Sequence, residues 1–242
     1  RPKKAGFVTM VRGTEKLGGG LTAFFQLEAG FSIDDGKSTL SDAGGNSVFR
    51  SRSFVGLGGG FGSVVLGRID GGRYSVAGRY DPFANGTVAN MASIQVHGTR
   101  ADNAIAYISP DWSGLSFLAA YTTNLVGQES PGNKGDGRLW AFIPSYSKGP
   151  LDLTLDLEQL TAKGSEEHKL KILVTAASYD FGPVKLHGYW ESIKTDNYKD
   201  IFDGTFATYN ALLDHRSWMV GLSAPILGDK AKVRMSYVSL ED

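Results

Sequence analysis

Residues 151–158 read LDLTLDLE, so every second side chain is leucine and the side chains between them are polar. Successive side chains of a β-strand point to opposite faces of the sheet. An α-helix would instead repeat its apolar residues every three or four positions. The stretch therefore predicts a strand with one apolar face and one polar face.

The same alternation recurs along the chain, with further segments that begin at Leu21, Leu115, Leu170 and Ala231. The segments are roughly 9 to 13 residues long, whereas strands of globular proteins usually have about 5 to 6. A tilted strand that crosses a bilayer needs about 9 to 11 residues. We therefore predict an all-β protein, a transmembrane antiparallel β-barrel, and count roughly twelve strands.

The connections between the segments differ in length. Short turns are predicted at stretches such as Gly18-Gly19-Gly20 and Gly58-Gly59-Gly60, and long polar loops at 32–47, 124–136 and 195–214. Short turns on one rim and long loops on the other are typical of outer-membrane barrels. The segment 70–102 is longer still, and a loop of that length is uncommon unless it is functional. We predict that it folds inward and narrows the lumen.

Composition excludes several other classes of protein. The 242 residues carry 25 basic and 25 acidic side chains, which argues against a nucleic-acid binder. The absence of cysteine excludes disulfides, thiolate zinc sites and cysteine nucleophiles. The four histidines show no paired metal-ligand spacing. Because no catalytic motif is present either, we expect no enzyme activity and no metal site.

The polar faces of the strands are expected to line a water-filled lumen, and the apolar faces to contact lipid. The predicted lumen residues are Gln26, Glu28, Asp152, Asp156, Lys169 and Lys232, and the predicted lipid-facing residues are Leu21, Phe25, Leu27, Leu115, Phe117, Leu153 and Leu155.

Charged side chains concentrate in the first strands and in the long segment. The candidate residues of a constriction are Arg12, Arg50, Arg52, Arg68, Asp70, Asp81 and Arg100. Fixed charges at a constriction set the ion preference of a channel directly. The alternative interpretation of the arginines is a set of solvated strand ends.

Several stretches resemble the general porins of β-proteobacteria. They are 12–21 (RGTEKLGGGL), 54–57 (FVGL), 61–68 (FGSVVLGR), 80–83 (YDPF) and 100–107 (RADNAIAY). The last of these is the most specific. The resemblance is strong up to about Tyr121 and thinner afterwards.

The resemblance implies a trimeric sixteen-stranded barrel whose third loop forms an eyelet. It also implies passive diffusion of ions and small hydrophilic solutes across the outer membrane of a Gram-negative bacterium, with no enzyme activity and no cofactor. The implied partners are the lipid bilayer, lipopolysaccharide and two further copies of the chain, with no nucleic acid. Arg100 and Arg12 match arginines of the family. Val8 and Ser51 stand where some anion-selective relatives carry basic residues, so we do not expect a strong anion preference.

The length of the chain sets a further expectation. Sixteen strands at about twenty residues each, turns included, need roughly 320 residues. We therefore expect this sequence of 242 residues to be one barrel domain, 1–242, of a chain that is longer at both ends. A soluble or surface-attached β-protein that binds carbohydrate or protein remains the alternative, with the apolar faces packed into a dry core.

Overall fold

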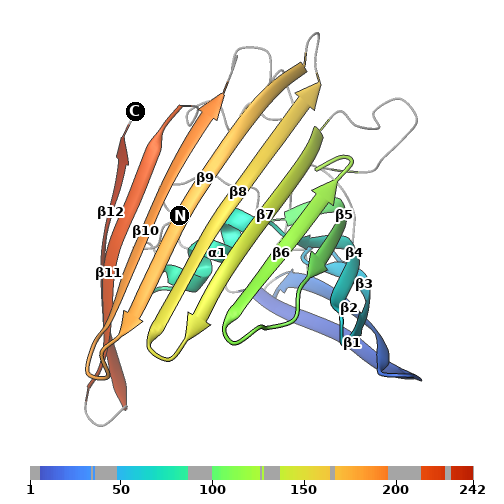
Figure 1. Cartoon of the computed structure of the whole chain (residues 1–242), viewed down its shortest axis with the longest axis horizontal. Helices are drawn as coiled ribbons and strands as arrows, with labels where there is room; N and C mark the ends of the chain where they lie inside the picture. The colour runs from blue at the N-terminus through green and yellow to red at the C-terminus, as the bar shows by residue number, and fades with distance from the viewer. Residues whose placement is uncertain are drawn as a thin grey trace.

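A computed structural model describes residues 6–33, 35, 48–86, 100–125, 127, 137–163, 167–195, 214–226 and 230–241. These residues form one antiparallel sheet of twelve strands and one helix. Each strand pairs with its neighbours in the sequence, which leaves β1 and β12 at the two edges (Figure 1). The all-β class and the number of strands confirm the prediction. No helix among the described residues is long and apolar enough to cross a membrane.

The strands and the helix have the following bounds. The first half contains β1 (Gly6–Gly18), β2 (Leu21–Ser32), β3 (Ser53–Gly59), β4 (Gly62–Asp70), α1 (Gly72–Tyr80), β5 (Arg100–Ile108) and β6 (Leu115–Thr122). The second half contains β7 (Gly137–Lys148), β8 (Leu151–Lys163), β9 (Glu167–Asp180), β10 (Lys185–Thr195), β11 (Arg216–Ile226) and β12 (Ala231–Glu241).

The short turns all lie at one end of the sheet. Between β1 and β2, Gly18, Gly19 and Gly20 have φ angles of 87°, 56° and 81°, a region that favours glycine. Between β3 and β4, only Gly60 and Phe61 separate the strands, so the glycine cluster forms a tight turn as predicted. The predicted long loops at the opposite end fall largely outside the described residues.

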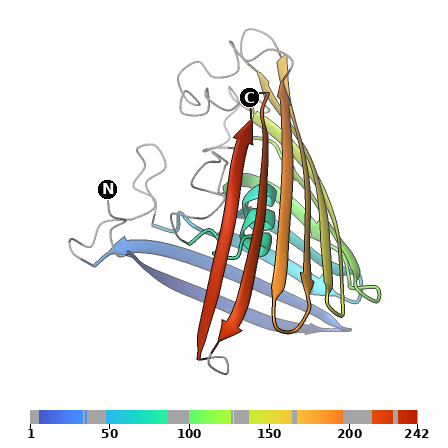
Figure 2. The ribbon, with the colours of Figure 1, turned by 90° about the vertical axis from the view of Figure 1, so that its left-hand side faces the viewer.

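Helix α1 lies on the concave side of the sheet, which curves around it (Figure 2). We call the face of the sheet that carries α1 the inner face and the opposite face the outer face. The helix contacts β8, β9 and β10. Its buried residues Val76, Ala77 and Tyr80 pack in one cluster with inner-face residues of these strands, such as Val174 and Ile193. The predicted inward segment 70–102 thus contains a helix, while 87–99 fall outside the described residues.

The helix begins close to the sheet because its first residue is glycine. A Cβ atom at Gly72 would lie 2.4 Å from Oε1 of Glu158 and 2.6 Å from Cδ1 of Ile143. The turn after the helix approaches the sheet equally closely, because a Cβ atom at Gly221 would lie 2.5 Å from Cγ of Pro82. Two glycines therefore allow the segment to lie against the wall at both ends.

The register of the strands assigns each side chain to a face. Asp152, Thr154 and Asp156 share the inner face of β8, and the leucines between them share the outer face. The lipid-facing set predicted from the sequence lies on the outer face throughout, with Leu115 and Leu153 half exposed there. Gln26, Glu28 and Lys232 lie on the inner face, as predicted.

The prediction for Lys169 is wrong. Lys169 is the register partner of Thr161, and both belong to the outer face. The inner face of β9 instead carries Ile172, Val174 and Ala176, which are buried in the cluster around α1. Alternation predicted two different faces of β9 correctly. The packing of α1 decides that the apolar face of this strand points inward.

Candidate functional site

An ionic network joins the ends of β2, β4 and β5 on the inner face. Arg52 donates a hydrogen bond from Nε to Oδ2 of Asp70 at 3.0 Å, and one of its Nη atoms lies 3.5 Å from Glu28. Arg100 lies on the other side of the same carboxylate, with Nη1 3.1 Å from Oδ1 of Asp70. Ser51 links the two ends of the network. It accepts a hydrogen bond from Arg100 at 2.8 Å and donates one to Glu28 at 2.5 Å.

Two more of the candidate arginines lie beside this network. Arg68 forms an ion pair with Asp102 and donates a hydrogen bond from Nε to the carbonyl oxygen of Arg50 at 2.7 Å. Arg50, Arg52, Arg68, Asp70 and Arg100 therefore belong to one stretch of wall. The sequence indicated this grouping, but not that Glu28, Ser51 and Asp102 balance it.

The remaining two candidates lie elsewhere. Arg12 is exposed on the inner face of β1, where its register partner is Gln26. Asp81 directly follows α1 and is almost fully buried. Its carboxylate accepts hydrogen bonds from the backbone N–H groups of Phe83 at 2.9 Å and Asn85 at 3.2 Å. Asp81 thus organises the turn after the helix.

A second network, which the sequence did not reveal, fixes the start of α1 to β8 and β10. The guanidinium of Arg73 forms a two-pronged pair with the carboxylate of Glu191, at 2.5 and 2.8 Å. The backbone N–H of Arg73 donates to Glu158 at 3.1 Å. Tyr189, Ser217 and His215 surround the same Glu191 carboxylate at 2.9, 3.3 and 3.5 Å. Both members of the pair are buried.

The end of α1 is fixed to β8 by a more exposed set of contacts. Arg79 donates two hydrogen bonds to Asp152, at 3.0 and 2.6 Å. The hydroxyl of Tyr80 lies 2.8 Å from the same carboxylate and 2.9 Å from Oγ1 of Thr154. The side chain of Arg79 is 42% exposed, which distinguishes this pair from the buried one at Arg73.

Helix α1 also contacts the network formed by Arg52, Asp70 and Arg100, so it connects β5 with β8 and β10. The guanidinium of Arg100 lies over the ring of Tyr74, 5.5 Å from its centroid. Tyr74 and Arg73 are neighbours in the helix, yet one contacts β5 and the other β10. The helix therefore spans the concave side of the sheet.

The pKa shifts of Arg73, Arg52 and Tyr80 all favour the protonated form of the side chain. Burial disfavours the charged form of Arg73, but the facing carboxylate of Glu191 outweighs this cost and raises the pKa of Arg73. The hydrogen bond to Asp70 raises the pKa of Arg52. Burial raises the pKa of Tyr80, so this phenol stays neutral and its hydroxyl donates a hydrogen bond to Asp152. Both arginines remain cations at any physiological pH.

Within the part of the chain that the structure describes, no group of three or more histidine, aspartate or glutamate side chains is arranged to hold a metal ion. The networks give the inner face of the sheet a polar, charged surface, and α1 is held against it at both ends.

Comparison with known proteins connects this architecture to one family. The family model of the Gram-negative porins matches residues 4–242. An outer membrane porin of Delftia acidovorans is 34% identical over 238 residues, which cover 94% of this chain and 62% of the relative. An outer membrane porin of Bordetella pertussis is 31% identical over 256 residues, which cover 90% of this chain and 63% of the relative. The chain therefore spans less than two thirds of the length of these relatives.

A solved structure gives the same result for the fold. The anion-selective porin from Comamonas acidovorans superposes with a TM-score of 0.72 at 30% identity. The superposition covers 96% of this chain and 68% of that porin.

Proposed function

The chain belongs to the Gram-negative porin family, and we propose that its full-length protein forms a water-filled channel through the outer membrane. Ions and small hydrophilic solutes would cross it by passive diffusion. The protein would act as a channel and not as an enzyme. One observation carries this proposal. Helix α1 is held across the concave side of the sheet by charged contacts to walls on both sides.

A helix in this place narrows the passage, and charged side chains remain beside it. We assign the lining of the constriction to Arg12, Arg50, Arg52, Arg68, Asp70 and Arg100 on the wall. Asp81 contributes by shaping the segment that follows the helix. Arg52 is 38% exposed, whereas Arg100 is only 13% exposed. Arg52 therefore meets a passing solute more directly than Arg100 does.

The selectivity of the channel follows from the balance of charge in the first network. Two cations, Arg52 and Arg100, share that network with two anions, Glu28 and Asp70. A similar porin is described as anion-selective. We propose that this channel prefers anions only weakly, because Glu28 and Asp70 compensate the two arginines.

The outer face supports a place in the bilayer. Large apolar side chains such as Leu57, Leu66, Leu115, Leu186 and Val220 are exposed on it, which suits contact with lipid tails. We propose that the full-length protein assembles as a homotrimer in the outer membrane, with lipopolysaccharide as a lipid partner.

Planar-bilayer recording tests the channel. The refolded full-length protein is expected to produce stable, ohmic conductance steps, whereas the same protein heated and left unfolded should produce none. A well-folded full-length protein that inserts into bilayers and passes no current would contradict the proposal.

A further inference from the structure

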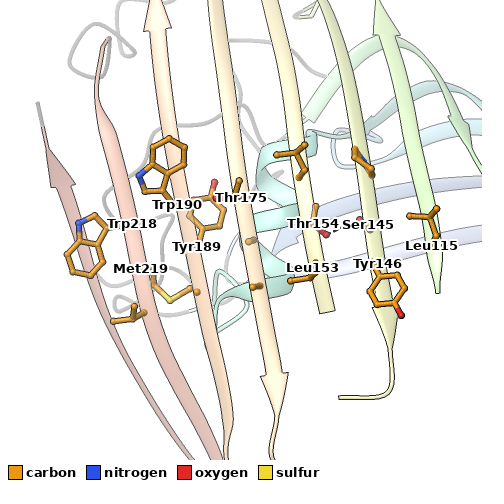
Figure 3. Close-up of a pocket in the computed structure, with 16 residues that line it drawn as sticks. Leu115, Ser145, Tyr146, Leu153, Thr154, Thr175, Tyr189, Trp190, Trp218 and Met219 are labelled. Carbon is orange, nitrogen blue, oxygen red and sulfur yellow. Dashed lines mark hydrogen bonds between the residues drawn. The ribbon is translucent and has the colours of Figure 1, made fainter. Parts of the chain in front are cut away.

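Two phenylalanine side chains lie on the inner face away from the cluster around α1. Phe24 on β2 and Phe54 on β3 share this face with Gln26, the register partner of Phe54. Both rings are partly exposed, and neither belongs to the apolar cluster that packs against α1. Aromatic side chains elsewhere, such as Trp190 and Trp218, line an apolar groove on the outer face (Figure 3). The inner wall therefore has an aromatic surface that the packing of α1 does not explain.

The two rings form a corner. Their centroids are 6.4 Å apart, and their planes lie at 82° to each other. Gly56 makes room for Phe24, because a Cβ atom at this position would lie 2.3 Å from Cζ of the ring. Aromatic rings prefer offset or edge-to-face contacts with centroids about 4.5–7 Å apart. A third ring that stacks on one phenylalanine would therefore meet the other in the edge-to-face geometry that aromatic pairs favour.

Two cations lie on either side of Phe24 on the neighbouring strand β1. Arg12 and Lys16 are exposed on the inner face. Their register partners, Gln26 and Thr22, lie two positions from Phe24 in opposite directions. Diagonal neighbours at this spacing are within reach of long side chains. Among the described residues, neither cation forms an ion pair or a hydrogen bond with another side chain.

We propose that Phe24, Phe54 and Arg12 bind aromatic carboxylates on their way through the channel. The ring of the solute stacks in the corner between the two phenylalanines. Its carboxylate accepts hydrogen bonds from Arg12, because a guanidinium can donate two parallel hydrogen bonds to a carboxylate. Lys16 adds a second positive charge four residues farther along β1, a distance of about 13 Å.

The two parts of the site select for different properties of the solute. The rings favour aromatic over aliphatic acids, and the cations favour acids over neutral solutes. This inference rests on the proposed function, because it requires the inner face to line a passage that solutes enter.

Titration of the conductance of the full-length channel in planar bilayers tests the site. The probes are benzoate, cyclohexanecarboxylate and glucose, each added at constant salt to both sides of the bilayer. Cyclohexanecarboxylate has the charge and nearly the size of benzoate but no aromatic ring. Benzoate should halve the wild-type conductance at a concentration about three- to tenfold lower than cyclohexanecarboxylate does, the range that aromatic contacts supply. Glucose should not block the channel.

Two substitutions separate the ring from the charge. Phe24→Leu keeps an apolar side chain but removes the ring, so it should weaken inhibition by benzoate about fivefold and leave inhibition by cyclohexanecarboxylate nearly unchanged. If Phe24 only covered Gly56, the substitution would change the effects of both acids equally. Arg12→Gln should weaken inhibition by both acids alike, about three- to fivefold, because it removes one exposed charged contact.

Phe25→Leu is the matched control. Phe25 is the next residue of β2 and covers its register partner Gly13, where a Cβ atom would lie 2.4 Å from Cε1 of the ring. It does so on the outer face, away from the passage. The substitution should therefore leave inhibition by both acids unchanged.

Three results would overturn the site: equal inhibition of the wild type by benzoate and cyclohexanecarboxylate, an unchanged ratio between the two acids in Phe24→Leu, or block by glucose that Phe24→Leu relieves. The last result would assign the rings to sugars. Channels of normal conductance that benzoate does not inhibit also reject the site, and they leave the proposed function intact. The absence of any conductance rejects the proposed function itself, and the site with it.

Discussion

At the scale of single residues, Asp70 is the carboxylate on which the first network depends. It lies between Arg52 and Arg100 and contacts both. Removing its charge leaves two cations facing one anion, Glu28, whereas removing Arg100 leaves one cation facing two anions. The two substitutions therefore change the fixed charge of the wall in opposite directions.

We expect Asp70→Asn to shift the reversal potential in a salt gradient toward the anion limit, and Arg100→Ala to shift it toward the cation limit. Bilayer recording of the full-length protein measures both shifts. Arg138→Ala removes the same charge from the outer face and should leave the reversal potential unchanged. If Arg100→Ala behaves like Arg138→Ala, Arg100 does not belong to the constriction.

The sequence identifies the arginines of the early strands and Asp70 as candidates for this charged wall. It does not identify the side chains with which they form hydrogen bonds and ion pairs. In the sequence Ser51 is only the replacement of a basic residue, whereas in the structure it joins Arg100 to Glu28. The sequence marks Asp81 as a charged candidate, and it does not show that the carboxylate accepts hydrogen bonds from the backbone of its own turn. Hydrogen-bond partners depend on distances that alternation does not encode.

At the scale of elements, α1 is fixed by one buried pair and one exposed pair. Removing one partner of a buried ion pair leaves an uncompensated charge, which costs roughly 3–5 kcal/mol. An exposed pair contributes only about 0–1 kcal/mol. Arg73 and Arg79 occupy the same nine-residue helix and differ mainly in this respect.

We expect Arg73→Ala to lower the free energy of unfolding by about 3 kcal/mol or more, because Glu191 is left buried and unpaired. Arg79→Ala should lower it by no more than about 1 kcal/mol. Urea titration of the full-length protein in lipid vesicles measures both. In single-channel recordings Arg73→Ala should also raise the conductance, because α1 is no longer held in the passage. Equal effects of the two substitutions would show that α1 is held by its apolar contacts alone.

The helix itself could not be predicted. Its sequence GRYSVAGRY contains few apolar residues and two glycines, so no helical periodicity is visible. Its stability comes from the wall, through pairs such as Arg73 and Glu191 that are 118 residues apart in the sequence. The same packing makes the apolar face of β9 point inward. Val174 and Ile172 are therefore core residues, and Lys169 lies on the outer face.

At the scale of the whole molecule, the fold follows from the alternation of apolar and polar residues that residues 151–158 show. Alternation with a period of two predicted the strands and the two faces of most of them, and the short turns between consecutive segments predicted their antiparallel order. It left one question open, namely whether the apolar face meets lipid or a dry protein core. In the structure the leucines of β8 lie on the outer face, away from α1, and Leu153 is 39% exposed there.

A pair of leucine substitutions on the outer face of β8 answers this question for the full-length protein. Leu155 lies within the strand, two outer-face positions beyond Leu151, and Leu151 lies at the short turn where β8 begins. In a bilayer, Leu155→Arg should cost about 2–4 kcal/mol and Leu151→Arg only about 0–1 kcal/mol, because the cost of a charge depends on its depth. Urea titration in lipid vesicles measures the difference. A lipid-facing strand requires this gradient, since the two positions share the strand, the face and the residue type. Equal costs at the two positions would argue that the leucines face protein, as in the soluble alternative.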